Sequence, residues 1–250
     1  MIQLKSNANI EAMKKAGRIT GEALALAGEK VKPGVTTKQL DDIVRSYIEK
    51  CGAKPSFLGY GGFPGAACIS INEEVIHGIP SSKRVLQDGD IVKIDVGAFI
   101  GGYHGDSANT FEVGNVSDDA KRLIEATKKS FYEGVANAVA GKRLGDIGSA
   151  IEGCVQQYGF SVVRDFVGHG IGRELHEMPN VPNYGRAGHG LRLMNGMTLA
   201  VEPMVCMGSP EVKVLSDKWT VVTCDSSWSA HYEHTVAITP DGLVYLTKID

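Results

Sequence analysis

The sequence predicts an α+β domain made of two similar halves, each with helices packed over antiparallel strands. Two helical segments followed by strand-like segments occur twice along the chain, and the second copy begins near residue 117. No low-complexity segment separates the two copies. We therefore expect one domain over residues 1–250, with halves of about 1–114 and 115–250 that meet at a shared site.

The first half begins with two predicted helices. The first is expected over residues 6–30, because the pair Pro33-Gly34 follows it and prevents its continuation. The second has Thr36 or Thr37 as its N-terminal cap and Gly52 at its left-handed end. Its apolar residues recur at the spacing of one helical face: Leu40, Ile43, Val44, Tyr47 and Ile48.

An extended segment over residues 67–71 comes next, followed by the clearest strand pair in the sequence. Residues 91–100 are apolar and β-branched, Gly101 and Gly102 offer a tight turn, and residues 103–113 run back. This pattern predicts an antiparallel hairpin.

The second half repeats the order of helices and strands. Ser117 caps a helix that is expected to end at Gly141, and a further helix is expected from Leu144 to Gly159. Strand-like segments follow at residues 160–167, 197–205, 219–223 and 231–239.

Composition and charge exclude several classes of protein. Apolar residues make up 43% of the chain and charged residues 22%, as in ordinary globular proteins. The net charge of −3 and the scattered lysines and arginines give no sign of binding to nucleic acid or to a membrane surface. The five cysteines are widely spaced without a C-x-x-C pair, which indicates reduced thiols. We expect a soluble cytoplasmic protein without a membrane span.

The predicted hairpin carries two aspartates that its register brings together. With a turn at 101–102, Asp95 pairs with residue 108, and Asp106 shares the face of that position. A bare carboxylate on an apolar strand is costly to bury, so the pair requires a cation or a hydrogen-bond network. Aspartates that only cap turns are the simpler alternative.

Histidines and glutamates of the second half add to this set. His169 lies between glycines, which let other groups approach its backbone, and His176 is too distant to share one helical metal-binding face with it. We expect distinct roles for them, although a lone histidine is more often a core residue. Glu202 and Glu233 each interrupt an apolar strand. A salt bridge could explain either glutamate alone, but four such acids indicate a metal site.

Five motifs occur together over nearly the whole chain: residues 69–80, the hairpin segments 93–97 and 105–110, and residues 168–172, 201–203 and 232–235. In their order and spacing they resemble the type I methionine aminopeptidases of peptidase family M24, in the short bacterial form. The resemblance implies the pita-bread fold, in which two pseudo-symmetric α+β halves surround a central dinuclear metal site.

The resemblance also implies a set of metal ligands. Asp106 and Glu233 match the residues that bridge the two ions. Four carboxylates and one imidazole form an oxygen-rich ligand set. Such a set suits Mn²⁺, Fe²⁺ or Co²⁺, and it differs from the sulfur-rich sites of zinc. Asn72 and Ser229 match a weaker site for a monovalent cation. The matched ligands of the divalent ions are Asp95, Asp106, His169, Glu202 and Glu233.

Catalytic and substrate-binding residues are implied in the same way. His77 and His176 match histidines that contact the substrate during catalysis. A hydroxide that bridges the two ions is expected to attack the scissile carbonyl, with Glu202 as the proton shuttle. The matched methionine pocket consists of Tyr60, Phe63, Cys68, Leu175 and Trp219, for which plain core packing is the alternative.

The implied activity is removal of the initiator methionine from nascent polypeptides whose second residue is small. The family resemblance further implies a cytoplasmic monomer that works near the ribosome, without nucleic-acid recognition or a membrane. One alternative is an Xaa-Pro aminopeptidase or prolidase, which shares the five ligands but carries an additional N-terminal domain. Another is a metal-free binding protein on the same fold, against which the retained ligands argue.

Three positions depart from the family pattern or have no assigned place in it. Leu175 stands where many members have phenylalanine, and Phe57 occupies a variable position. Trp228 precedes the last motif and has no assigned role.

Overall fold

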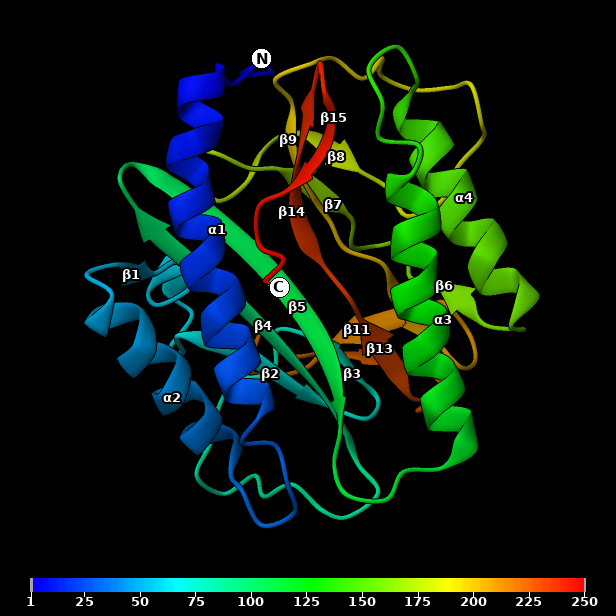
Figure 1. The fold of residues 1–250 in the computed structure, drawn as a ribbon. Coiled ribbons are helices and arrows are strands. Elements are labelled where there is room, and N and C mark those ends of the chain that lie inside the picture. Colours follow the sequence, from blue (N-terminus) through cyan, green and yellow to red (C-terminus); the bar gives the residue numbers. More distant parts are fainter. Residues whose placement is uncertain (1, 250) are drawn as a thin grey trace.

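Strands occupy the middle of the molecule, and helices cover them on two sides. The computed structural model describes residues 2–249, so Met1 and Asp250 of the predicted domain lie outside the described residues. In this part of the chain four antiparallel sheets are flanked by α1 and α2 on one side and by α3 and α4 on the other (Figure 1). The predicted α+β class is confirmed. Within residues 2–249, none of the helices is long and apolar enough to cross a membrane.

Both predicted helices of the first half are confirmed. α1 (Asn7–Gly28) begins after Ser6, whose side chain caps its first turn. α2 (Thr37–Lys50) begins after Thr36, which caps the helix in the same way. Gly52 has a φ of +71° and follows the end of α2 in the left-handed conformation that the sequence predicted.

The predicted hairpin is confirmed, including its register. β4 (Ile91–Ile100) pairs along its whole length with β5 (Tyr103–Glu112). Asp95 lies opposite Ala108, two positions from Asp106 on the same strand. The two carboxylates are therefore diagonal neighbours on one face of the hairpin, as expected.

Short strands complete this sheet and form a second one. They are β1 (Lys54–Pro55), β2 (Ala67–Ile71), β3 (Glu74–Ile76), β11 (Val212–Val214) and β12 (Val221–Thr223). β1 and β2 pair with the second edge of β4, so the predicted strand at residues 67–71 is confirmed. β3 pairs with β12, which joins a strand of the first half to one of the second.

The two helices of the second half are present, but the first is shorter than predicted. α3 (Asp118–Val135) begins after its cap Ser117, and α4 (Leu144–Gln157) ends close to the expected glycine. The end predicted for α3 at Gly141 is wrong. The N–H of Gly141 donates to the carbonyl of Leu193 at 2.9 Å, so this backbone pairs with a distant loop instead of continuing the helix.

Two strands predicted as continuous break at their glutamates. The segments 197–205 and 231–239 become β9 (Thr198–Val201), β10 (Met204–Cys206), β13 (Ser229–His231) and β14 (His234–Thr239). Pro203 has no N–H to donate to a ladder, which explains the first break. β9 pairs with β14 and β10 pairs with β13, so the breaks at Glu202 and Glu233 lie side by side.

The remaining strands of the second half are short. They are β6 (Ser161–Val162), β7 (Gly168–Gly170), β8 (Glu177–Val181) and β15 (Gly242–Tyr245). The strand predicted at residues 160–167 is reduced to β6, because its partner β10 is itself only three residues long. β7 pairs with β8 and β9 and brings the glycine-flanked histidine beside the break in β9.

Each half buries an apolar core of its own. One core lies between α1, α2 and the sheet of β4, and the other lies between α3, α4 and the strands of the second half. A third apolar cluster contains residues of both halves, among them Phe63, Cys68 and Leu175. The predicted methionine pocket therefore lies where the halves meet.

Backbone hydrogen bonds join the hairpin to the second half. The N–H of Glu233 donates to the carbonyl of Ala108 at 2.9 Å, and the N–H of Asp106 donates to the hydroxyl of Thr235 at 3.0 Å. These bonds hold β5 against the break between β13 and β14. The carboxylates of the two halves are brought together as a result.

α1 crosses β5 with backbone against backbone. A Cβ added at Gly105 would lie 2.8 Å from the Cα of Gly17, and the hydroxyl of Thr20 donates to the carbonyl of Gly105 at 3.1 Å. A Cβ added at Gly17 would lie 2.2 Å from the carbonyl oxygen of Leu246. The close packing of α1 thus depends on glycines on both elements.

Candidate metal and substrate site

The five predicted divalent-metal ligands line one cavity of about 150 Å³. Asp95 and Asp106 come from the hairpin, and His169 comes from β7. Glu202 and Glu233 come from the adjacent strand breaks, where the chain leaves the ladder and its side chains can turn inward. The strand breaks that the sequence did not predict therefore supply two of the five side chains.

Donor atoms in the cavity lie at distances that a shared cation can span. Nε2 of His169 is 3.5 Å from a carboxylate oxygen of Glu202 and 3.8 Å from one of Asp106. Donors of Asp106, His169 and Glu233 all lie within 4.8 Å of one another. Glu233 also belongs to a second such group, with Glu202 and His231. The two groups share Glu233, so their donor atoms surround one continuous space.

In the absence of a cation, burial disfavours the ionised form of the carboxylates in this cavity. It raises the pKa of Asp95 to about 7. Burial first, and then the charges of neighbouring carboxylates, raise the pKa values of Asp106, Glu202 and Glu233 well above their usual range. Among the described residues, one oxygen each of Asp95, Asp106 and Glu233 has no hydrogen-bond partner. Divalent ions would compensate these charges, so the residues fit a metal centre.

The ring of His169 is oriented for ligation. Its Nδ1 lies 2.9 Å from the carbonyl oxygen of Gly170, which only an N–H can satisfy. Nε2 therefore carries the lone pair and faces the carboxylates. Burial lowers the pKa of His169 to about 4, which keeps the ring neutral.

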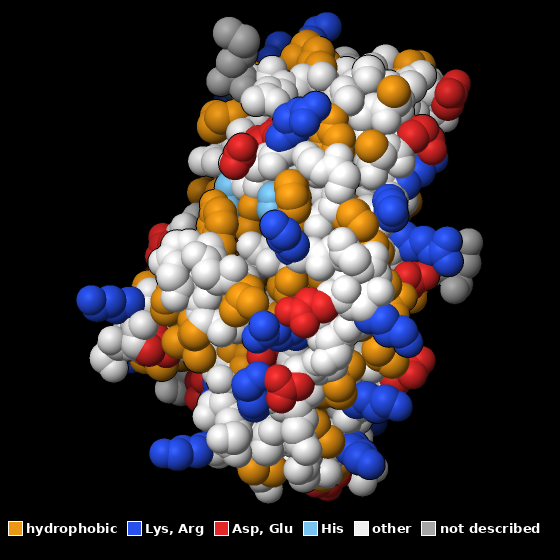
Figure 2. All heavy atoms as spheres, turned by 90° about the vertical axis from the view of Figure 1, so that its left-hand side faces the viewer, with side chains coloured by type: hydrophobic (Ala, Val, Ile, Leu, Met, Phe, Trp, Pro, Cys, Tyr) orange, Lys and Arg blue, Asp and Glu red, His pale blue; other side chains and the backbone are white. Residues whose placement is uncertain are grey.

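The predicted substrate-binding residues form the wall of the same cavity. On the face shown in Figure 2, histidine side chains lie among hydrophobic ones. The hydroxyl of Tyr60 lies 2.8 Å from Nδ1 of His176, and the ring of Phe63 meets Trp219 edge to face at 5.1 Å. The remaining predicted wall residues are Cys68, His77 and Leu175.

Two of the unassigned positions have clear places in the structure. Phe57 lines the cavity beside the predicted pocket residues. Trp228 lies against the apolar core of the second half, away from the cavity. Phe57 therefore belongs to the wall of the cavity, and Trp228 is a packing residue.

His231 lies beside Glu202 and Glu233, although sequence reasoning did not select it. Its Nε2 is 3.9 Å from a carboxylate oxygen of Glu202 and 3.8 Å from one of Glu233. It precedes Glu233 by two positions, so alternation along a strand could have placed both side chains on one face. The break between β13 and β14 obscured that relation.

The residues predicted to hold a monovalent cation both contact a buried lysine. Nζ of Lys93 donates to the carbonyl oxygens of Asn72 at 2.7 Å and Ser229 at 3.0 Å. Lys93 is only 2% exposed, and burial lowers its pKa to about 7. The two carbonyl acceptors favour the charged form of the amine.

Comparisons with known proteins agree with this geometry. Residues 11–240 match metallopeptidase family M24. The chain is 55% identical to a methionine aminopeptidase of Clostridium acetobutylicum, over 99% of both chains, and 56% identical to that of Clostridium perfringens, over 100% of both. The crystal structure of methionine aminopeptidase from Thermotoga maritima superimposes with a TM-score of 0.98, at 45% identity and over 100% of both chains.

A prolidase from Pyrococcus furiosus shares the fold more distantly. Its TM-score is 0.79 at 25% identity, and the match covers 99% of this chain but 66% of the prolidase. The methionine aminopeptidases match at higher identity and over their full length. The α+β architecture is thus the pita-bread fold, and the chain belongs to metallopeptidase family M24 and, within it, to the methionine aminopeptidases.

Proposed function

We propose that this protein is a metalloaminopeptidase that removes the N-terminal methionine from polypeptides whose second residue is small. The observation that carries the proposal is one cavity in which four carboxylates and His169 lie together with an apolar, aromatic wall. The names of the relatives support the same activity.

Asp95, Asp106, His169, Glu202 and Glu233 would hold two divalent ions, with Asp106 and Glu233 shared between them. When bound, such ions polarise a carbonyl and lower the pKa of a coordinated water. The oxygen-rich donor set favours Mn²⁺, Fe²⁺ or Co²⁺. The side chains of the protein supply the remaining steps.

Glu202 is the proposed proton shuttle. Its carboxylate lines the cavity, 3.5 Å from Nε2 of His169, where it can reach a water at the proposed ions. It would accept the proton of the attacking water and donate it to the leaving amine. The side-chain amide of Asn183 donates to the backbone carbonyl of Glu202 at 3.0 Å and steadies this segment.

His176 is proposed to stabilise the charge that develops on the carbonyl oxygen. Its Nδ1 is engaged by the hydroxyl of Tyr60, which leaves Nε2 for the substrate. His77 would hydrogen-bond the scissile amide. Its ring lies edge to face with Phe166 and Trp219, at centroid distances of 5.9 and 6.3 Å, and these contacts restrict its orientation.

The apolar wall would bind the methionine side chain. Tyr60, Phe63 and Trp219 offer aromatic edges, which interact favourably with a thioether sulfur. Cys68 and Leu175 complete the wall with small and medium apolar surfaces. The flexible methionine side chain suits this uneven slot.

We further propose that the chain acts as a single domain and a monomer in the cytoplasm, on nascent polypeptides near the ribosome. All proposed ligands and wall residues come from one chain, so the site needs no second copy. Sedimentation of the purified protein, alone and with ribosomes, tests both parts. A stable dimer, or a failure to sediment with translating ribosomes, would contradict the corresponding part.

Cleavage assays test the main proposal. Chelated protein should release no methionine from Met-Ala-Ser, and added Mn²⁺, Fe²⁺ or Co²⁺ should restore the activity. Peptides of the form Xaa-Pro should be cleaved far more slowly. Faster cleavage of Xaa-Pro would favour a prolidase, and full activity without any detectable metal would refute the metal centre.

A further inference from the structure

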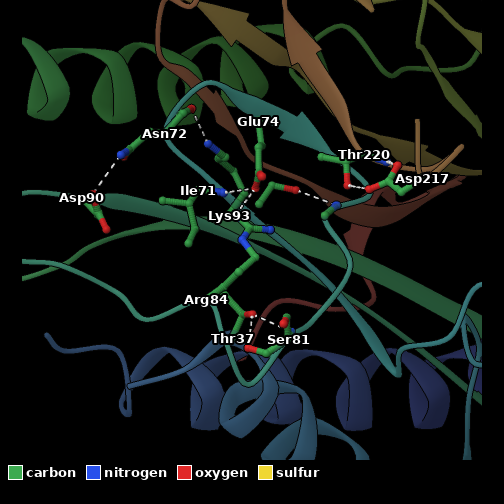
Figure 3. Close-up of polar contacts among 12 residues, drawn as sticks. Thr37, Ile71, Asn72, Glu74, Ser81, Arg84, Asp90, Lys93, Asp217 and Thr220 are labelled. Carbon is green, nitrogen blue, oxygen red and sulfur yellow. Dashed lines mark hydrogen bonds and ion pairs between the residues drawn. The ribbon is translucent and has the colours of Figure 1, made fainter. Parts of the chain in front are cut away.

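A buried lysine links the two halves of the molecule next to the proposed metal centre. Lys93 is 2% exposed and belongs to β4, where it lies two positions before Asp95 on the same face of the strand. Its Nζ donates to the carbonyl oxygens of Asn72 at 2.7 Å and Ser229 at 3.0 Å (Figure 3). We propose that Lys93 is a positioning residue whose side-chain amine substitutes for a monovalent cation at these two carbonyl groups.

The amine occupies the acceptors that such a cation would need. Backbone carbonyl oxygens are the groups that replace the hydration shell of K⁺ when a protein binds it. The carbonyl oxygen of Asn72 accepts from Nζ of Lys93 and also from the N–H of Ser229, at 3.0 Å. A carbonyl oxygen has two lone pairs, so this one is fully used by the two donors. An added ion would therefore have to compete with Lys93.

The two carbonyl groups belong to segments that lead into the cavity. Asn72 forms the turn before β3, and His77 of the cavity wall follows directly after that strand. Ser229 begins β13, and Glu233 follows two positions after β13 ends. Lys93 therefore ties both segments to the hairpin that carries the two aspartates of the cavity.

The turn at Asn72 is also anchored without Lys93. Its side-chain amide donates to Asp90 at 2.8 Å and accepts from the N–H of Ile91 at 2.9 Å (Figure 3). Its backbone N–H donates to the carbonyl of Ile91 at 3.0 Å. These bonds fix the turn to the start of β4, although its φ of +50° is rare outside glycine. Loss of the amine should therefore loosen the junction with β13 while the turn itself persists.

Thermal unfolding of the wild type in different salts is the first test. The purified protein is unfolded in KCl, NaCl and choline chloride at equal ionic strength, with choline as a cation too large for a buried site. Because the amine already occupies the carbonyl groups, the three Tm values should agree within about 1 °C. A saturable rise of Tm with K⁺ or Na⁺ would overturn the proposal, whether or not any variant folds.

Two variants separate the amine from the space that it fills. Lys93→Ala removes the donor and leaves room for an ion beside the two carbonyl groups. Its Tm should fall by at least about 5 °C in choline chloride and recover by at least about 2 °C, along a saturating curve, in KCl or NaCl. Lys93→Met fills the space with an apolar side chain, so its Tm should fall equally in all three salts.

A third variant controls for general effects of salt. Lys15 is exposed on α1, and Lys15→Ala should have the same Tm in the three salts. A folded Lys93→Ala protein whose Tm is also the same in the three salts would overturn the proposal.

Activity distinguishes a positioning residue from one that only stabilises the fold. If Lys93 orients His77 and Glu233, the kcat of Lys93→Ala on Met-Ala-Ser should fall by at least about 10-fold at a temperature where the variant is folded. K⁺ or Na⁺ should restore kcat over the same concentration range as Tm. Normal kcat of this variant in choline chloride would refute the positioning role.

The activity measurement rests on the proposed function, whereas the Tm measurements do not. A wild type that releases no methionine in any metal would refute the proposed function, and the Tm values would still decide whether Lys93 takes the place of an ion.

Discussion

Replacement of Gly105 by alanine should destabilise the protein and impair the metal centre together. The new Cβ would lie 2.8 Å from both the Cα and the N of Gly17 and 3.0 Å from the carbonyl carbon of Ala16. These are backbone atoms, so no flexible side chain can move aside. To restore a contact of about 3.4 Å, α1 must move away from β5 by roughly 0.6 Å, which is overpacking of the kind that costs about 1–3 kcal/mol.

That cost corresponds to a lower Tm of about 2–12 °C in a chain of this length. Differential scanning calorimetry of the metal-loaded protein measures the shift, and a peptide assay measures turnover. Turnover should also fall, because Gly105 precedes Asp106, whose carboxylate lies at the cavity.

Gly153→Ala is the matched control for this prediction. Gly153 lies within α4 and has open space where a Cβ would stand. Alanine there should raise stability by about 0.5–1 kcal/mol, because alanine is the better helix former. Equal shifts of Tm in the two variants, or an unchanged Gly105→Ala protein, would refute the steric reasoning.

Three further predictions concern the site. Glu202→Gln should keep the fold by circular dichroism but lower kcat by several orders of magnitude, and near-normal turnover of the metal-loaded variant would remove Glu202 from its role. His176→Ala should lower kcat by about 10²-fold or more and change KM less, so an effect on KM alone would contradict a role in charge stabilisation. Chelation should lower Tm, and the Tm of the chelated protein should fall as pH rises through about 7. The reason is that burial raises the folded-state pKa of Asp95 to that value, so the stability present at low pH is lost as this carboxyl ionises. A chelated protein that becomes more stable over the same pH range would contradict this sign.

Local sequence signals predicted the first half well. The helix caps Ser6 and Thr36 and the turn at 101–102 each depend on residues within a few positions, so their effects can be deduced without the fold. The register of the hairpin then placed Asp95 and Asp106 together.

The second half was harder because its geometry is set by distant partners. Pro203 was a local sign of a broken strand, but the break at Glu233 follows from its bonds to Ala108 on the hairpin. The surroundings of His231 and of Lys93 are likewise set by atoms that other strands contribute. The two-residue spacing of His231 and Glu233 was a local signal for the first, whereas the contacts of Lys93 are visible only in the assembled fold.

The packing of α1 has a consequence for how the protein folds while it is being synthesised. Its glycine-lined face meets the carbonyls of Leu246 and Thr247, and near its start Lys5 pairs with Glu177, 172 positions along the chain. During synthesis the glycine-lined face of this first helix therefore stays uncovered until the C-terminal segment has been translated, although its core with α2 and β4 can form earlier. Such exposure is the usual occasion for chaperone binding or misassembly. A chaperone that binds roughly the first thirty residues at the ribosome should accordingly raise the yield of folded protein. The increase should exceed that given by a chaperone that binds the released chain.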